Sequence, residues 1–399
     1  MRLIYYSPHP THDLVSEVGY STHQRETINA LKDLGVEVLP VVMGGSQVSE
    51  LQYTEGKAIE HNGLKYYIKK VTPRFIWVSI KDFFLLQHDK KAGRILNQAI
   101  LDFKADIVYE RSEYLQDSGV KPVKSHKIKY FIEVNAPFVE EMIAMEGRSI
   151  WISLAHKKEK KKYKNADKIF VVSSALKDFI LKRYKIDPDK IIISPNRINP
   201  DLFLKNTISE KPNNLIDFKD STVIGFVGSI LPHHYVDVLI EAFNKVIKLD
   251  KKASLLIIGE GALLNQLKSM VNQYGLNDQV FFIGKVPHHQ VHNYINQMDV
   301  CVMPGSNWYG SPIKIFEYAV LGKAIVAPDN SPLRDVMVNG EDGILVETNA
   351  EKLAIAFIDL IDSAELRATL GNKFKTKVLA DYTWKSAAKM IINAVENHL

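Results

Sequence analysis

Two side chains of opposite charge, Lys314 and Glu317, stand three residues apart in the segment Tyr-Gly-Ser-Pro-Ile-Lys-Ile-Phe-Glu-Tyr. Ser311 is a favoured helix N-cap residue and Pro312 suits the first helical position, so we expect a helix to begin here. Residues three apart on a helix share a face. A helix N-terminus attracts anions, and Gly310 would let a ligand approach the backbone. The spacing predicts either a site that binds phosphate and sugar hydroxyls or an ordinary surface ion pair.

A second candidate site is the loop that follows the apolar run at 222–227. There Gly228 and Ser229 are followed by His233 and His234, before the next amphipathic stretch. Hydrogen-bond donors between a strand and a helix are what a nucleotide diphosphate needs. Two solvent-exposed histidines in an ordinary strand-to-helix loop would give the same pattern.

In the first half of the chain, three polar side chains end apolar runs. Arg111 closes one run, and Glu133 and Asn135 close the next. Because ligands of parallel sheets bind at the carboxyl ends of strands, the three are candidate acceptor or donor-sugar ligands. The structural alternative is a buried Arg–Glu pair that holds two strand ends together.

The elements that must position these residues alternate short apolar strands with amphipathic helices. Strands are expected at 3–6, 36–42, 107–109, 128–134, 168–172, 191–193, 222–227, 253–258, 280–283, 300–303 and 324–327, and helices at about 22–34 and 236–249. Short β-branched runs flanked by helical periodicity predict parallel sheets covered on both faces. We therefore expect an α/β protein with two Rossmann-like domains in series and a cleft between them, joined near a polar linker at 206–220.

Composition narrows the function classes. The chain has 399 residues, 46% of them hydrophobic, and its 51 Lys and Arg against 46 Asp and Glu give a charge of +5. This excludes a disordered chain and argues against a general nucleic-acid binder. The single cysteine, Cys301, excludes a disulfide framework and a multi-cysteine metal site. Since no apolar run is long enough to span a bilayer or serve as a signal peptide, we expect a cytoplasmic protein.

A family resemblance covers residues 165–350 well and the N-terminal half more loosely. In order, the segments 225–229, 238–243, 256–261, 280–284, 312–318 and 322–327 resemble the donor-binding domain of GT-B glycosyltransferases, in particular the large retaining family 4. The resemblance implies a GT-B fold, with two Rossmann-like domains facing across a cleft. Residues 1–200 would form the acceptor-binding domain and 201–381 the nucleotide-sugar donor-binding domain, with a C-terminal helix at about 382–399 returning to the first domain.

The resemblance also assigns donor-binding roles. Glu317 matches the final acid of a Glu-x7-Glu motif that holds the ribose, whereas Tyr309 stands where the first acid would be. Ser229 and His234 occupy positions where many members carry an Arg and a Lys that neutralise the diphosphate. We expect Lys314 to take over much of that neutralisation with His234 as a hydrogen-bond donor. If His234 must be protonated, donor affinity should fall as the pH rises through about 6.5.

The donor-binding set then comprises Gly19, Tyr20, Ser229, His234, Gly310, Ser311, Pro312, Lys314, Ile315 and Glu317. Gly19 and Tyr20 resemble the family's glycine loop near the diphosphate, although a simple helix N-terminus is the alternative. Arg111 stands where many relatives place an active-site histidine, so we take Arg111, Glu133 and Asn135 as the catalytic candidates.

The function that the resemblance implies is retaining transfer of a sugar from a nucleotide-sugar donor to a hydroxyl acceptor, with a UDP-sugar favoured and a GDP-sugar possible. Front-face transfer needs no protein nucleophile, and no Asp-x-Asp motif is visible, so no cofactor and no metal are expected. A lipid-linked or cell-surface saccharide in polysaccharide biosynthesis is the candidate acceptor. Two alternatives remain: a UDP-sugar 2-epimerase-like isomerase, and a non-catalytic nucleotide-sugar binding protein, which the departures at Tyr309 and Ser229 allow.

Six lysines occur among the nine residues that begin at His156 and end at Lys164. They predict either a solvated helix or peripheral contact with anionic lipid at the inner face of the cell membrane. The apolar runs at 75–78 and 83–86 would add a docking patch or belong to the core.

Overall fold

The computed structural model describes residues 1–16, 19–44, 72–204, 216, 218 and 220–396, so most of the expected linker lies outside the described residues. The chain forms two compact units. Unit 1 comprises residues 1–172, 176–194 and 387–399, and unit 2 comprises residues 173–175 and 195–386. The division falls between residues 194 and 195, six residues before the expected boundary at 200.

Unit 1 is built on a parallel six-stranded sheet with the order β2-β1-β3-β4-β5-β6. Its strands are β1 (Arg2–Ser7), β2 (Glu37–Val42), β3 (Ile107–Arg111), β4 (Lys129–Val134), β5 (Lys168–Val171) and β6 (Ile191–Ile193). The central strands are buried along almost their whole length, which is why they read as continuous apolar runs.

Helices cover both faces of this sheet. They are α1 (Gly19–Asp33), α3 (Arg74–Phe103), α4 (Val120–His126), α5 (Phe138–Glu146), α6 (Ile152–Asn165), α7 (Ser174–Tyr184) and, from residue 387 on, α16 (Trp384–Glu396). The last helix therefore returns to unit 1, where Lys129 Nζ donates to the carbonyl of Val395 at 3.0 Å. The 30-residue helix α3 was not expected. It packs closely on the residues before α4, since a Cβ on Gly93 would lie 3.1 Å from the carbonyl oxygen of Ser118.

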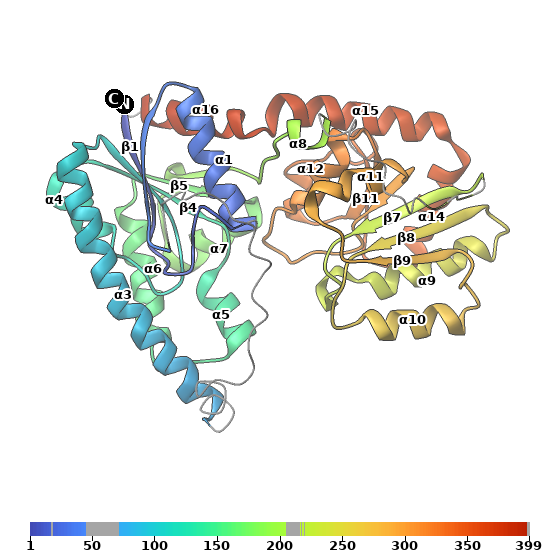
Figure 1. Cartoon of the computed structure of the whole chain (residues 1–399), viewed down its shortest axis with the longest axis horizontal. Coiled ribbons are helices and arrows are strands. Elements are labelled where there is room, and N and C mark those ends of the chain that lie inside the picture. Colours follow the sequence, from blue (N-terminus) through green and yellow to red (C-terminus); the bar gives the residue numbers. More distant parts are fainter. Residues whose placement is uncertain (17–18, 45–71, 205–215, 217, 219, 397–399) are drawn as a thin grey trace. The chain divides into compact units, whose positions relative to one another are not determined.

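Unit 2 repeats the architecture with a parallel sheet ordered β12-β11-β10-β7-β8-β9. Its strands are β7 (Thr222–Val227), β8 (Ala253–Ile258), β9 (Val280–Gly284), β10 (Val300–Val302), β11 (Ala324–Pro328) and β12 (Ile344–Val346). One apolar cluster joins the sheet to α9 (Val236–Ile247), α10 (Leu264–Gln273) and α14 (Ala350–Asp362). A second joins the opposite face to α11 (Val291–Asn296), α12 (Ile313–Val320) and α15 (Ala364–Asp381) (Figure 1).

Strand order determines which loops meet. In unit 2, β7 and β10 are neighbours, so the loop at 228–235 lies beside the connection at 303–312 that leads into α12. In unit 1, β1, β3 and β4 are neighbours, and their carboxyl ends lie beside one another. Each unit therefore gathers its candidate residues at one edge of its sheet.

Candidate functional site

Helix α12 begins differently from the sequence prediction. Pro312, not Ser311, is the N-cap residue, and no side chain caps the helix. The predicted cap by Ser311 is wrong because its hydroxyl accepts a hydrogen bond from the backbone N–H of Asn196 at 3.0 Å, while its carbonyl accepts from Asn196 Nδ2 at 2.5 Å. The N–H groups at the start of α12 are thus left without a side-chain acceptor, which favours an anion there.

The amine of Lys314 lies buried beside these groups. Within the described chain, Lys314 Nζ has no hydrogen-bond partner, and it stands 4.5 Å from the ring centroid of Phe226. Burial lowers the pKa of Lys314 to about 8, although the charge of Glu317 opposes the shift. A Cβ on Gly228 would lie 2.5 Å from this amine, so the glycine makes room for it. A buried cation without an acceptor gains more from an anionic ligand than a solvated lysine does.

Glu317, one turn further along α12, is 7% exposed. Its Oε1 lies 3.0 Å from Nε2 of His288, whose side chain is largely exposed. Lys314 and Glu317 share a helix face but form no ion pair among the contacts of the described residues, so the simple surface pair is not what the structure shows. Ile315, by contrast, is wholly buried in the core.

The residues before α12 are held by their own loop. The N–H of Gly310 donates to Asn307 Oδ1 at 2.7 Å, and a Cβ on Gly310 would lie 2.5 Å from that oxygen. The carbonyl of Tyr309, the residue expected at the position of the family's first acid, accepts a hydrogen bond from Ser173 Oγ at 2.6 Å. The contact with Asn307 therefore favours a glycine at position 310.

His234 and Lys314 lie against the same aromatic ring: the His234 ring is 5.8 Å from that of Phe226, which the Lys314 amine also faces. The Nδ1 of His234 lies 2.5 Å from the carbonyl oxygen of Ser229, and because a carbonyl only accepts, Nδ1 carries the proton. In the neutral ring Nε2 is then an acceptor. Burial and the charge of Lys314 lower the pKa of His234 to about 4. The ring is therefore neutral at physiological pH, and the expected transition near 6.5 does not fit this geometry.

In unit 1, Arg111 and Glu133 pair across neighbouring strands β3 and β4. Arg111 Nη1 donates to Glu133 Oε1 at 2.8 Å, and Asn135 Nδ2 donates to the same oxygen at 2.6 Å. Tyr109 donates to the other carboxylate oxygen at 3.0 Å. Burial raises the pKa of Glu133, but the charges of His23 and Arg111 outweigh it and hold the pKa below its usual range.

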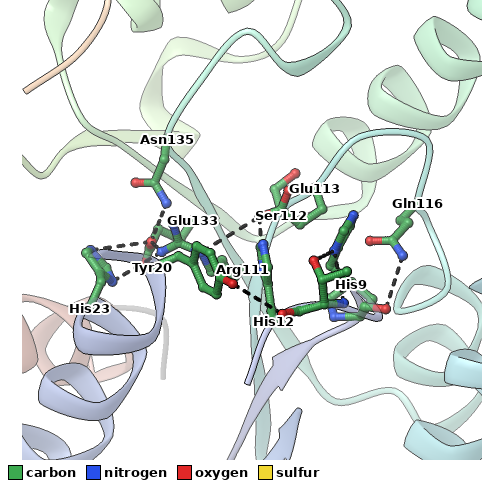
Figure 2. A network of polar contacts seen from close by, with 12 residues as sticks. His9, His12, Tyr20, His23, Arg111, Ser112, Glu113, Gln116, Glu133 and Asn135 are labelled. Atoms are coloured by element: carbon green, nitrogen blue, oxygen red, sulfur yellow. Dashed lines mark hydrogen bonds and ion pairs between the residues drawn. The ribbon is translucent and has the colours of Figure 1, made fainter. Parts of the chain in front are cut away.

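Three members of this network escaped the sequence prediction (Figure 2). His23 from α1 lies 3.2 Å from Arg111 Nη1 through its Nδ1. Glu113 Oε1 lies 3.7 Å from Arg111 Nε and 3.4 Å from Nδ1 of His12. Burial raises the pKa of Glu113 to about 7. In the sequence, Glu113 and His23 are marked only by their nearness to predicted residues. Glu113 follows Arg111 by two residues, and His23 is the last residue of the segment 19–23 that resembles the glycine loop.

The glycine-loop residues take different places. Tyr20 stacks on the ring of His12, with centroids 4.4 Å apart, and its hydroxyl donates to the carbonyl of Thr11 at 3.3 Å. A Cβ on Gly19 would meet no atom within 4 Å, so packing against the described protein does not demand a glycine there.

The structure thus collects the predicted residues into two groups. The first group, which we call the Lys314 cluster, lies in unit 2 and contains Ser229, His234 and the start of α12. The second group, which we call the Glu133 cluster, lies in unit 1 and contains Arg111, Glu133 and Asn135. Because Glu133 is saturated by its partners and only 5% exposed, it is a fixed acceptor, poorly suited to be a nucleophile.

Comparison with known proteins covers both units. Residues 19–202 match the family described as Glycosyltransferase Family 4, and residues 207–377 match Glycosyl transferases group 1. The fold is similar to that of HepE from Anabaena, solved in complex with UDP, with a TM-score of 0.70, 11% identity and 100% of each chain covered. Together they confirm the predicted GT-B fold.

Curated relatives align over part of the chain. An uncharacterized glycosyltransferase of Methanocaldococcus jannaschii is 28% identical over 229 residues, which is 57% of each protein. The GPI3 subunit of the phosphatidylinositol N-acetylglucosaminyltransferase of Saccharomyces cerevisiae is 22% identical over 233 residues, 58% of this chain and 51% of the relative. The chain therefore spans only a little over half the length of the curated relatives it matches.

Proposed function

Because the chain belongs to the GT-B glycosyltransferases of family 4 and group 1, we propose that it transfers a sugar from a nucleotide-sugar donor to a hydroxyl acceptor. One observation carries the proposal most directly. The buried amine of Lys314 has no hydrogen-bond partner in the described chain and lies at an uncapped helix N-terminus. Cation and helix terminus together suit the diphosphate of such a donor.

The neighbouring residues suit the rest of a nucleotide. We propose that the carboxylate of Glu317 accepts hydrogen bonds from the ribose hydroxyls, with His288 moving aside because its side chain is mostly exposed. A UDP-linked donor is our first choice, since the similarly folded HepE was solved with UDP. A GDP-linked donor remains the second choice.

The proposed reaction is retaining front-face transfer. The bond from the anomeric carbon to the diphosphate breaks, the acceptor oxygen bonds to the same face, and the leaving phosphate oxygen takes the acceptor proton. Lys314 and the start of α12 would stabilise the charge that develops on the diphosphate. In this proposal these groups neutralise the donor without a metal ion.

The Glu133 cluster of unit 1 is proposed to bind the sugars. The Oδ1 of Asn135 is buried and has no hydrogen-bond partner among the described residues, so it can accept from a sugar hydroxyl. Oε1 of Glu133 fixes the amide by accepting from Asn135 Nδ2, and the same oxygen accepts from Arg111. Arg111 and Glu133 then position Asn135 rather than react themselves. The acceptor is proposed to be a saccharide hydroxyl, lipid-linked or on the cell surface.

A donor screen tests this function. We expect UDP-sugars to raise the melting temperature of the chain more than GDP- or ADP-sugars, with or without EDTA, because a ligand that binds only the folded state stabilises it. Glu317→Gln should weaken that binding about tenfold, as loss of a charge-assisted hydrogen bond predicts. Glu365→Gln, on the exposed start of α15, is the matched control.

Turnover separates the alternatives. A sugar transferred to a member of a saccharide acceptor panel with retained anomeric configuration supports the proposal. An epimerised donor in the absence of acceptor would point instead to the isomerase, and binding without turnover across the panel would point to a non-catalytic binding protein.

The pH dependence of donor binding should follow Lys314 rather than His234. Because the pKa of His234 is about 4 and that of Lys314 about 8, we expect UDP affinity to be level from pH 5.5 to 7 and to fall above pH 8. Calorimetric titration across this range checks the expectation, with His233→Asn as the control for His234→Asn. A transition near pH 6.5 that disappears in His234→Asn alone would contradict it.

A further inference from the structure

An apolar groove opens along the first turns of α3. It has a volume of about 430 Å³ and lies between α3 and the residues just before α6. Six of its lining side chains are between 44% and 65% exposed: Phe75, Ile76, Ile80, Phe83, Phe84 and Ile150. Single exposed apolar residues are ordinary, but a contiguous group of this size marks a docking surface.

The backbone beneath the groove is firmly held. Ser79 links α3 to α6 twice, since its hydroxyl accepts from the N–H of Ile150 at 3.1 Å and its carbonyl accepts from Trp151 Nε1 at 3.0 Å. Arg74 donates to two carbonyls at the end of α5. The apolar side chains therefore stand on a fixed platform.

The same face of α3 becomes basic further along. Lys90 and Arg94 follow Ile76, Ile80 and Phe83 at helical steps of three, four or seven residues, which keeps them on one face. A polar cavity of about 580 Å³ lies here, lined by α3, α4 and α6. Its basic lining includes Lys90, Arg94 and Lys121.

The acids of this cavity are already neutralised. Asp89 pairs with Lys158 at 2.8 Å, and Asp117 pairs with both Lys158 and Lys161. Among the described residues, Lys90, Arg94 and Lys121 have no carboxylate partner. The cavity thus offers unpaired positive charge next to the apolar groove.

We propose that this face of α3 docks unit 1 onto an anionic lipid bilayer. Phe83, Phe84 and their neighbours would enter the interfacial region, while Lys90, Arg94 and Lys121 contact the headgroups. Ile80 and Arg94 are separated by about 21 Å along the helix, at 1.5 Å per residue, which is more than one lipid headgroup spans. The continuous change from apolar to basic therefore fits a surface of many lipids better than one bound molecule.

The proposal relocates the membrane contact suggested by the lysine run. Lys158 forms ion pairs inside the cavity, and Lys162 is wholly buried, so neither is available to a membrane. Lys157, Lys160 and Lys164 remain exposed on α6 and add positive charge near the surface. None of the described helices is both long and apolar enough to cross a membrane, so the proposed contact is peripheral.

Vesicle sedimentation of the full chain tests the proposal. Wild type should bind vesicles of equimolar phosphatidylcholine and phosphatidylglycerol, and added salt should weaken the binding. Phe83→Ser/Phe84→Ser should lower the partition coefficient about tenfold because two half-exposed aromatic rings no longer enter the interface. Leu101→Ser is the matched control, since Leu101 is 50% exposed on the same helix outside the groove.

A second pair of variants tests the charge. Lys90→Gln/Arg94→Gln should remove most of the preference for anionic over pure phosphatidylcholine vesicles, whereas Lys352→Gln/Lys385→Gln in unit 2 should leave it. The rise in melting temperature that UDP causes should be unchanged in all variants, which separates this proposal from the proposed role of the Lys314 cluster. Equal sedimentation of wild type, Phe83→Ser/Phe84→Ser and Lys90→Gln/Arg94→Gln would overturn it. So would a wild-type dimer by light scattering that the phenylalanine variant loses without any vesicle binding, since the occupant would then be a second copy.

Discussion

Replacing Lys314 by methionine is expected to weaken UDP binding about a hundredfold while leaving the ligand-free chain at least as stable as wild type. The loss follows from the position of the amine, buried at the uncapped start of α12 with no hydrogen-bond partner in the described chain. A hydrogen bond to a charged group contributes about 1.5–3 kcal/mol, and 1.4 kcal/mol corresponds to a factor of ten. Since the amine would serve a diphosphate with several oxygens, the upper part of that range applies.

The expected stability of the ligand-free Lys314→Met chain follows from the pKa of Lys314. Burial lowers that pKa from 10.5 to about 8, so between these values the unfolded chain binds more protons than the folded one. The free energy of unfolding therefore rises with pH from about 8 to 10.5, and below pH 8 the folded chain bears the whole cost of the buried charge. The lysine side chain is half-buried overall, so we discount this cost to about 2 kcal/mol. Methionine removes it.

Calorimetric binding of UDP and thermal unfolding at pH 7, on the same samples, measure both effects. Lys268→Met is the matched control, because Lys268 also lies over an aromatic ring, 5.9 Å from Phe282, but is exposed on α10. Lys314→Arg should retain part of the affinity, limited by the space beside Gly228. A Lys314→Met chain that binds UDP like wild type would refute the assignment, and one that is markedly less stable would show that the lysine serves the fold instead.

Most of the sheets could be predicted from the sequence. Strands such as β7 and β8 are short, buried on both faces and β-branched, so their limits match the apolar runs. The three-residue strand β12 was missed although the equally short β6 and β10 were predicted, and only the middle residue of β12 is buried. The helix α3 was missed because its exposed face is apolar at 75–84, which reads as core when neighbouring elements are unknown.

In the candidate site, features that depend on neighbours in the sequence could be predicted, and features that depend on distant residues could not. The shared face of Lys314 and Glu317 follows from spacing alone. The failed cap at Ser311 depends on Asn196, which is 115 residues away, and the low pKa of His234 depends on its burial and on the charge of Lys314. Partners brought in by the strand order, such as His23 beside Arg111, leave no mark in the local sequence.

Lys162→Met is expected to lower the free energy of unfolding by about 3–5 kcal/mol at pH 8, the usual cost of breaking a buried ion pair. Lys162 is 0% exposed, although it lies in a run of lysines that reads as a solvated helix. Its Nζ donates to Ser112 Oγ at 2.6 Å and to the carbonyl of Glu113 at 3.0 Å, and lies 3.9 Å from Glu110 Oε1. Glu110 is also wholly buried, so methionine leaves its carboxylate without the cation that compensates it.

The pH dependence of this loss identifies Glu110 as its cause. Burial raises the pKa of Glu110 to about 7, against an opposing effect of Lys162. The folded chain therefore binds more protons than the unfolded chain between pH 4.5 and 7, and the contribution of Glu110 to stability falls as pH rises through that window. Without Lys162 the pKa rises further, so the fall continues to higher pH. At pH 5.5 Glu110 is protonated in either folded chain, so the loss should be smaller than at pH 8 by up to about 1.4 kcal/mol, the value of the one pH unit between the wild-type pKa of about 7 and pH 8.

Denaturant unfolding of Lys162→Met and Lys160→Met at pH 5.5 and 8 measures this difference. Lys160 lies on the same helix two residues away and is exposed, so its variant should match wild type within about 0.5 kcal/mol at both pH values. In a Glu110→Gln background, Lys162→Met should cause the same loss at both pH values, since the amide does not titrate, even if the double variant stays less stable than wild type. An equal loss at both pH values would mean that Lys162 acts through packing alone. Its burial would then have no electrostatic connection to the strand end that carries Arg111, whereas a loss that is larger at pH 8 than at pH 5.5 places a titrating carboxylate one residue from that arginine.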